Sequence, residues 1–128
     1  MKDDFNREDL EKALHAINSM GLKAERAKQK FVMGTAQHTL QNNRHNALNI
    51  ASSLIPKEST EKVLPAFSRE ELEKALAPIS SLLTKSEKAL TKLKPGSWQN
   101  AAMSRNIEAL LIVSSLLTKA LDEMSTAK

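Results

Sequence analysis

The chain has 128 residues, of which 41% are hydrophobic and 27% are charged, with a formal net charge of +4. This composition excludes a disordered chain, and the absence of cysteine excludes disulfides and thiolate metal sites. No apolar run approaches the ~18–20 residues needed to cross a bilayer, and the acidic start of the sequence is unlike a secretion signal. We therefore expect a single domain in the cytoplasm, without membrane association.

An internal repeat organises the sequence. Residues 5–57 align with residues 67–119 at a constant offset of 62 and without a gap, and 23 of the 53 aligned positions are identical. The copies begin FNREDLEKAL and FSREELEKAL, and they end ALNIASSLIPK and ALLIVSSLLTK. This pattern predicts a tandem duplication, with units 1–62 and 63–124 inside one helical domain spanning residues 1–128.

The first unit opens with a predicted helix over residues 6–32. Asn6 is placed to cap it, with Asp9 at the third helical position, and Phe5 and Leu10 stand at the positions of a hydrophobic staple. Apolar residues then recur in steps of three and four, which is the period of one helix face. They are Leu10, Ala13, Leu14, Ile17, Met20, Ala24, Ala27 and Phe31.

The rest of the first unit predicts a second helix over residues 35–55. Gly34 ends the first helix, Thr35 is suited to cap the next one, and Pro56 stops it. The apolar face of this helix contains Leu40, Ala47, Leu48, Ala51, Leu54 and Ile55. Residues 57–66 then form the predicted crossover between the units.

The second unit repeats the pattern, with predicted helices over residues 68–93 and 97–124. Ser68 and Glu71 form a capping box at the start of the first of them, and a glycine separates the two helices as in the first unit. Pro78 lies inside the first helix, where it removes a backbone hydrogen bond at a cost of about 3 kcal/mol. We therefore expect a kink or a helix restart there.

These four helices predict an all-α, four-helix bundle made of two tandem-duplicated helical hairpins with pseudo-two-fold symmetry. A closed bundle within one chain is the leading arrangement. An exchanged dimer, in which each hairpin packs on that of a second chain, is the alternative, because the crossover is long enough to permit it.

Basic side chains concentrate in two bands, at residues 22–30 and 85–94. Each band holds four cations and one acid, and so carries a net charge of +3. The cations are Lys23, Arg26, Lys28 and Lys30 in the first band, and Lys85, Lys88, Lys92 and Lys94 in the second. One interpretation is that positive helix ends complement the helix dipole. The other is a basic surface that binds phosphates or an acidic partner.

A column of polar residues falls on the apolar register of the second helix of each unit. Its members are Gln37 and Arg44 in the first unit, and Gln99 and Asn106 in the second. We expect these side chains to point inward, or at least toward the helix flank. Because an unpaired buried polar group costs ~1–3 kcal/mol, either backbone carbonyls satisfy them or they hold a small anionic ligand.

Two apolar residues are candidates for contact with a partner. Trp98, the only tryptophan, is expected to cover the core, and the alternative is that it anchors a partner protein. Leu111 lies in the apolar run 109–113, which is too apolar for a helix that is covered on one side. We predict that Leu111 or its neighbours meet a second subunit in a homodimer.

The sequence contains no recognisable catalytic or metal-binding constellation. His38 and His45 roughly share a helix face, but no carboxylate stands beside them at ligand spacing. Neither Glu-x-x-His nor His-Glu-x-x-His occurs, so we expect no enzyme activity, no cofactor and no metal.

These observations favour a small protein–protein interaction or structural module whose protein partner the sequence does not reveal. A basic scaffold that associates with nucleic acid or another polyanion is the first alternative, although aromatic residues make up only 3% of the chain and no nucleic-acid-binding motif occurs. A small-anion-binding bundle that uses the polar column is the second alternative.

Overall fold

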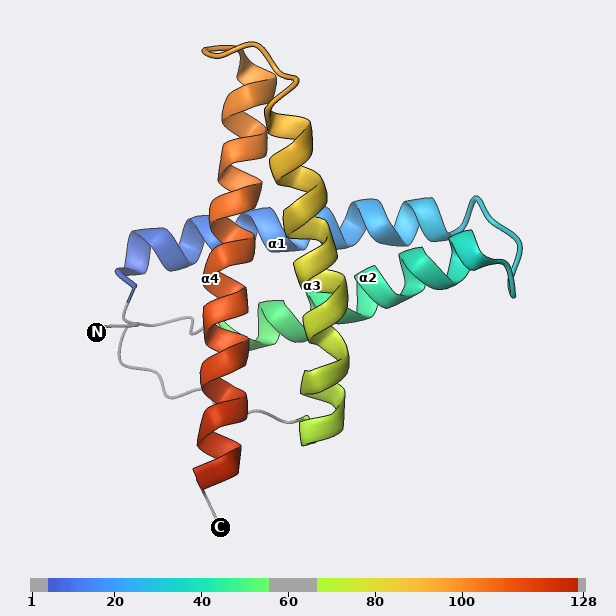
Figure 1. The fold of residues 1–128 in the computed structure, drawn as a ribbon, viewed down its shortest axis with the longest axis vertical. Helices are drawn as coiled ribbons and strands as arrows, with labels where there is room; N and C mark the ends of the chain where they lie inside the picture. The colour runs from blue at the N-terminus through green and yellow to red at the C-terminus, as the bar shows by residue number, and fades with distance from the viewer. Residues whose placement is uncertain (1–4, 56–66, 127–128) are drawn as a thin grey trace.

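The structure, a computed structural model, describes residues 5–55 and 67–126, with the side chains of residues 125 and 126 left out. Its four helices are α1 (Arg7–Lys28), α2 (Ala36–Leu54), α3 (Arg69–Leu90) and α4 (Trp98–Thr126), and no strand occurs in the described ranges (Figure 1). The predicted all-α, four-helix arrangement is therefore confirmed. The predicted crossover at residues 57–66 lies outside the described residues.

Side-chain caps explain where the helices begin. The Asn6 side chain accepts a hydrogen bond from the N–H of Asp9 at 2.8 Å, and Thr35 caps α2 in the same way. At the start of α3, the N–H of Ser68 donates to the Glu71 carboxylate at 2.8 Å, while the N–H of Glu71 donates to the Ser68 hydroxyl at 3.1 Å. These hydrogen bonds confirm the predicted caps. Each cap provides an acceptor for an N–H group that has no partner within the helix.

The first helix of each hairpin ends earlier than the apolar pattern predicts. α1 ends at Lys28 and α3 ends at Leu90, before the predicted ends at positions 32 and 93. The next residues form tighter turns, such as the one in which the N–H of Phe31 donates to the carbonyl of Lys28 at 3.2 Å. Gly34 and Gly96 therefore lie inside the connecting loops, where their φ angles of 91° and 87° favour glycine.

The two hairpins cross one another. α1 packs along α2, and α3 packs along α4. Figure 1 shows the α1–α2 hairpin running across the view and the α3–α4 hairpin running down it. At the crossing, α1 contacts α4, while α2 contacts both α3 and α4; in the described part of the chain α1 and α3 do not meet. The arrangement is thus a pair of crossed hairpins, not four helices aligned along one axis.

The hydrophobic core lies where the hairpins cross. Its largest fully buried side chains come from all four helices, and they are Ile17, Leu48, Leu72, Ile79, Leu110, Val113 and Leu117. By contrast, not one residue of 25–43 or of 80–108 is buried. We call these two segments the first and second hairpin tips; they form the outer parts of the two hairpins (Figure 1).

The position of α4 explains its long apolar run. α4 contacts each of the other three helices, so it is covered on more than one side. Ala109, Leu110 and Val113 are buried and Ile112 is partly buried, while Leu111 remains 50% exposed. Because other helices of the same chain cover residues 109–113, the apolar character of this run does not require a second subunit. The contact of Leu111 with a partner stays a prediction.

α3 continues through Pro78 without a break, so the predicted helix restart is wrong. Pro78 has no N–H to donate to the carbonyl of Lys74, four residues earlier. Both residues lie on the side of α3 that faces α2. The contacts of α3 with α2 and α4 hold the helix together across this missing bond.

Candidate functional site

The hairpin tips carry most of the two basic bands. All eight cations are exposed except Lys28, which is partly buried and donates to the Asn42 side chain at 3.3 Å. Only Arg26, Lys28 and Lys88 lie in the last turn of their helices, where the helix dipole acts. The dipole therefore accounts for only part of each band.

No carboxylate neutralises these bands in the described part of the chain. Four acidic residues at the starts of α1 and α3 instead pair with neighbouring cations, as in Arg7–Glu11 at 3.1 Å and Glu70–Lys74 at 3.4 Å. None of the eight band cations within the described residues has a carboxylate oxygen within 4.0 Å. In the described residues, the outer part of each hairpin thus carries cations without an ion-pair partner. Nearer the crossing, ion pairs neutralise part of the negative charge.

The tips also expose large apolar side chains. In the loop of the first tip, Val32 is 75% exposed and Met33 is 80% exposed, with Phe31 beside them. In the second tip, Trp98 is 76% exposed. The predicted role of Trp98 as a cover over the core is therefore wrong. Trp98 begins α4 at the outer end of its hairpin, where no helix of the other hairpin packs over it (Figure 1).

The structure does not assemble the predicted polar column into one buried site. Arg44 is buried, with 9% of its surface exposed, and Asn106 is partly buried. Gln37 and Gln99 are exposed, because both lie in the first turn of their helices within the hairpin tips. The Nε atom of Arg44 is buried and makes no hydrogen bond, so the expected partnership with backbone carbonyls does not form at this atom.

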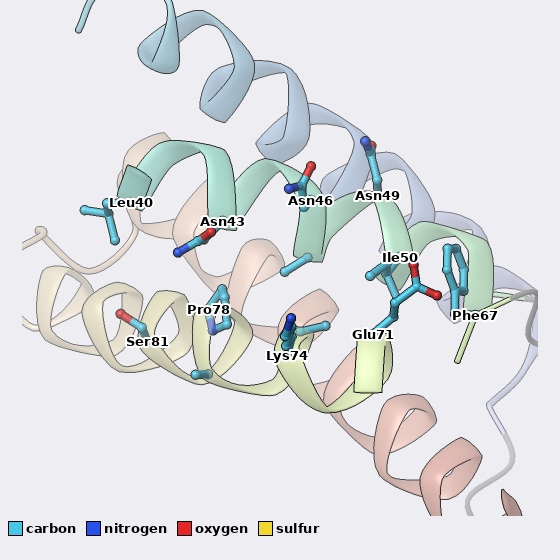
Figure 2. A pocket seen from close by; sticks show the side chains of 13 residues that line it. Leu40, Asn43, Asn46, Asn49, Ile50, Phe67, Glu71, Lys74, Pro78 and Ser81 are labelled. Atoms are coloured by element: carbon cyan, nitrogen blue, oxygen red, sulfur yellow. The ribbon is translucent and has the colours of Figure 1, made fainter. Parts of the chain in front are cut away.

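A groove of about 720 Å³ lies between α2 and α3, and we call it the α2–α3 groove. α2 lines it with Leu40, Asn43, Asn46, Ala47, Asn49 and Ile50. Across from them, Phe67 and Ser81 mark the ends of the α3 side, and Pro78 faces Asn43 (Figure 2). The volume is within the range of ~300–1,000 Å³ that is usual for ligand sites.

The sequence interpretation missed the α2–α3 groove, although a signal was present. The three asparagines at positions 43, 46 and 49 stand three residues apart on one predicted helix. At the aligned positions of the second unit the residues are Arg105, Glu108 and Leu111. A comparison of the two units for differences, and not only for identities, would have marked these positions.

The comparisons with known proteins assign this chain to no class. Neither a family model, nor a curated protein, nor a solved structure matches the chain. Within the described residues, no group of three or more His, Asp or Glu side chains is arranged to hold a metal ion. The described helices also include none that combines the length and the apolar character required to cross a membrane.

Proposed function

We propose that this protein is a bivalent interaction module whose two hairpin tips bind acidic protein surfaces. The observation that carries the proposal is that each tip combines exposed apolar side chains with cations that no carboxylate of the described chain neutralises. Apolar anchors surrounded by charge are typical of protein interfaces, and unpaired cations attract an acidic surface over long distances.

Both tips carry exposed apolar and basic side chains, so the module has two attachment points. We propose that the two tips arose by tandem duplication of one hairpin unit, at residues 1–62 and 63–124, which produces a pseudo-two-fold molecule. The support is the 62-residue offset, at which the bounds of α1 recur in α3 and the start of α2 recurs in α4. Linked sites of moderate affinity bind a partner with two matching surfaces far more tightly than either does alone.

Association with nucleic acid or another polyanion is the second candidate, because the same unpaired cations favour it. Proteins that hold single strands usually stack bases on several aromatic side chains. Here only Phe31 and Trp98 supply aromatic rings in the tips. Anion binding at the polar column has less support, since two of its four residues lie exposed in the tips.

The proposal is tested by affinity capture from the native source, followed by binding measurements with the purified partner. Three variants are compared with the wild type: Lys88→Glu with Lys92→Glu, Trp98→Ser, and Lys119→Glu. The first two alter the second tip, whereas Lys119 is an exposed cation near the other end of α4 and serves as the charge control. We expect an acidic partner whose binding weakens with added salt, falls in both tip variants and persists in the control.

Nuclease treatment of the extract separates the two candidates. A partner that is still captured after treatment binds as a protein, whereas loss of capture would favour the nucleic-acid alternative. Equal binding by the wild type and both tip variants would contradict the proposal.

A further inference from the structure

The α2–α3 groove has a much smaller counterpart between α1 and α4. That second cavity measures about 40 Å³ and is lined by seven residues. Each of the seven stands 62 positions from a residue that lines the α2–α3 groove, as Arg105 does from Asn43 and Glu108 from Asn46. The same positions of the two hairpins therefore form one large groove and one small cavity, so the fold alone does not open the groove.

Side-chain size differs between the two sites. Arg105 and Glu108, which line the small cavity, are longer than Asn43 and Asn46, which line the groove at the aligned positions. At a third position, Asn49 replaces the apolar Leu111. Two of these differences replace a charged side chain and the third replaces an apolar one, in each case by a short, uncharged amide.

The amides of the groove have unused hydrogen-bonding capacity. In the described part of the chain, the side chains of Asn43, Asn46 and Asn49 make no hydrogen bond. Each amide offers one acceptor oxygen and two N–H donors, which matches the donor and acceptor of a peptide unit. Pro78 adds to this capacity, because it leaves the carbonyl of Lys74 without its usual donor on the same side of α3.

The charged residues of the groove are already engaged. Lys74 pairs with Glu70 at 3.4 Å, and the Glu71 carboxylate accepts the N–H of Ser68 at 2.8 Å. A phosphate or carboxylate ligand would reach the exposed Lys74 only beside the Glu70 carboxylate, and it would also approach the negative charge of Glu71. Leu40, which is 42% exposed, and the partly buried Ile50 give the groove apolar surface that suits an aliphatic side chain.

We propose that the α2–α3 groove binds a short, uncharged peptide segment of a partner protein. The asparagine amides hold its main-chain N–H and C=O groups, and an aliphatic side chain of the segment packs on Leu40 and Ile50. This site borders the inner ends of the tips at Leu40, Asn43 and Ser81, but it does not use their exposed loop residues or their basic bands. Its ligand has the opposite requirement, since the tips select acidic groups and the groove selects neutral ones.

The experiment uses the full chain and an array of N-acetylated, C-amidated octapeptides in which charged and aliphatic residues are varied systematically. The test variant is Asn43→Arg with Asn46→Glu, which introduces the residues found at the aligned positions of the smaller cavity. The control is Asn18→Arg, at an exposed position of α1 that lies outside both cavities. Circular dichroism and thermal unfolding verify that each variant folds.

We expect uncharged, aliphatic octapeptides to bind the wild type and the control, and to bind the test variant about tenfold or more weakly through the loss of at least two hydrogen bonds. A titration of the ¹⁵N-labelled protein with the best octapeptide then shifts the side-chain amide resonances of Asn43, Asn46 and Asn49. Those of Gln37, which is exposed in the first tip, stay in place.

Three results would overturn the inference: no octapeptide binds, binding is equal in the test variant, or the three asparagine resonances do not move when an octapeptide binds. If only acidic octapeptides bind, and the tip variants abolish that binding, the groove proposal fails while the proposed function of the tips is supported.

Discussion

At the scale of single residues, the glycines illustrate two opposite backbone requirements. Gly21 lies buried inside α1, where an added Cβ would meet the Leu48 Cβ at 3.9 Å, an ordinary contact distance. Gly34 has a φ of 91°, which side chains with a Cβ rarely adopt, although the space around it is open. One glycine is therefore tolerated by the helix, and the other is required by the loop.

The two glycines are expected to respond in opposite ways to substitution by alanine. Gly21→Ala removes backbone freedom from the unfolded chain and fits the available space, so it raises the free energy of unfolding by about 0.5–1 kcal/mol. Gly34→Ala forces a Cβ into left-handed backbone and lowers that free energy by about 1–2 kcal/mol. Urea unfolding followed by circular dichroism measures both, and changes of the same sign in the two variants would refute the assignment.

At the scale of the helices, local side-chain chemistry fixes where each element begins. The Ser68–Glu71 capping box satisfies two N–H groups at the start of α3. Ser80, in contrast, is an exposed serine in the interior of the same helix. These two serines allow the contribution of the cap to be measured within one element.

Loss of the α3 cap is expected to destabilise the protein. Ser68→Ala leaves the N–H of Glu71 without its acceptor and should lower the free energy of unfolding by about 1 kcal/mol. Ser80→Ala, the matched control, should leave it unchanged or raise it slightly, because alanine has the higher helix propensity. Equal effects of the two substitutions in urea unfolding would show that the cap contributes nothing.

The sequence predicts the helices well because their signals are local. Caps such as Asn6 and Ser68 place the helix starts within one residue, since the capping side chain and the N–H that donates to it lie three residues apart. The ends of α1 and α3 are missed, because apolar residues continue into the turns after Lys28 and Leu90. Periodicity shows which face of a helix is covered, but it does not show how far along the helix that cover extends.

To predict the candidate sites, one must know how far along each helix the cover by neighbouring helices extends. The exposure of Trp98 and of Gln37 follows from the crossing of the hairpins, which leaves the outer turns without cover. The crossing involves contacts between helices that lie far apart in the sequence, such as α1 with α4. The basic bands, by contrast, are visible in the sequence, because exposed charges follow one another along the chain.

At the scale of the whole molecule, the residues that stabilise the fold and the residues that we propose to bind partners lie in different parts of the structure. The core is concentrated at the crossing, and the tips extend from it without buried residues. This division lets the tips present apolar and basic side chains while the crossing maintains the fold. Because of this division, the loss of stability caused by a substitution depends on its position along a hairpin.

Truncation at the crossing and at a tip should therefore differ sharply. Leu110→Ala creates a cavity at a fully buried position and should lower the free energy of unfolding by about 2–5 kcal/mol. Met33→Ala, at a position that is 80% exposed, should change it by no more than about 0.5 kcal/mol. Comparable losses in the two variants would mean that the first tip is covered in the folded protein.

The exposure of the tips is tested most directly by the fluorescence of Trp98, the only tryptophan of the chain. The measurement is quenching by acrylamide at low protein concentration; a neutral quencher is needed because nearby lysines would concentrate iodide. We predict water-like emission from the folded protein and quenching nearly as strong as in the urea-unfolded chain. Blue-shifted emission that acrylamide quenches weakly in the folded monomer would contradict the crossed-hairpin account.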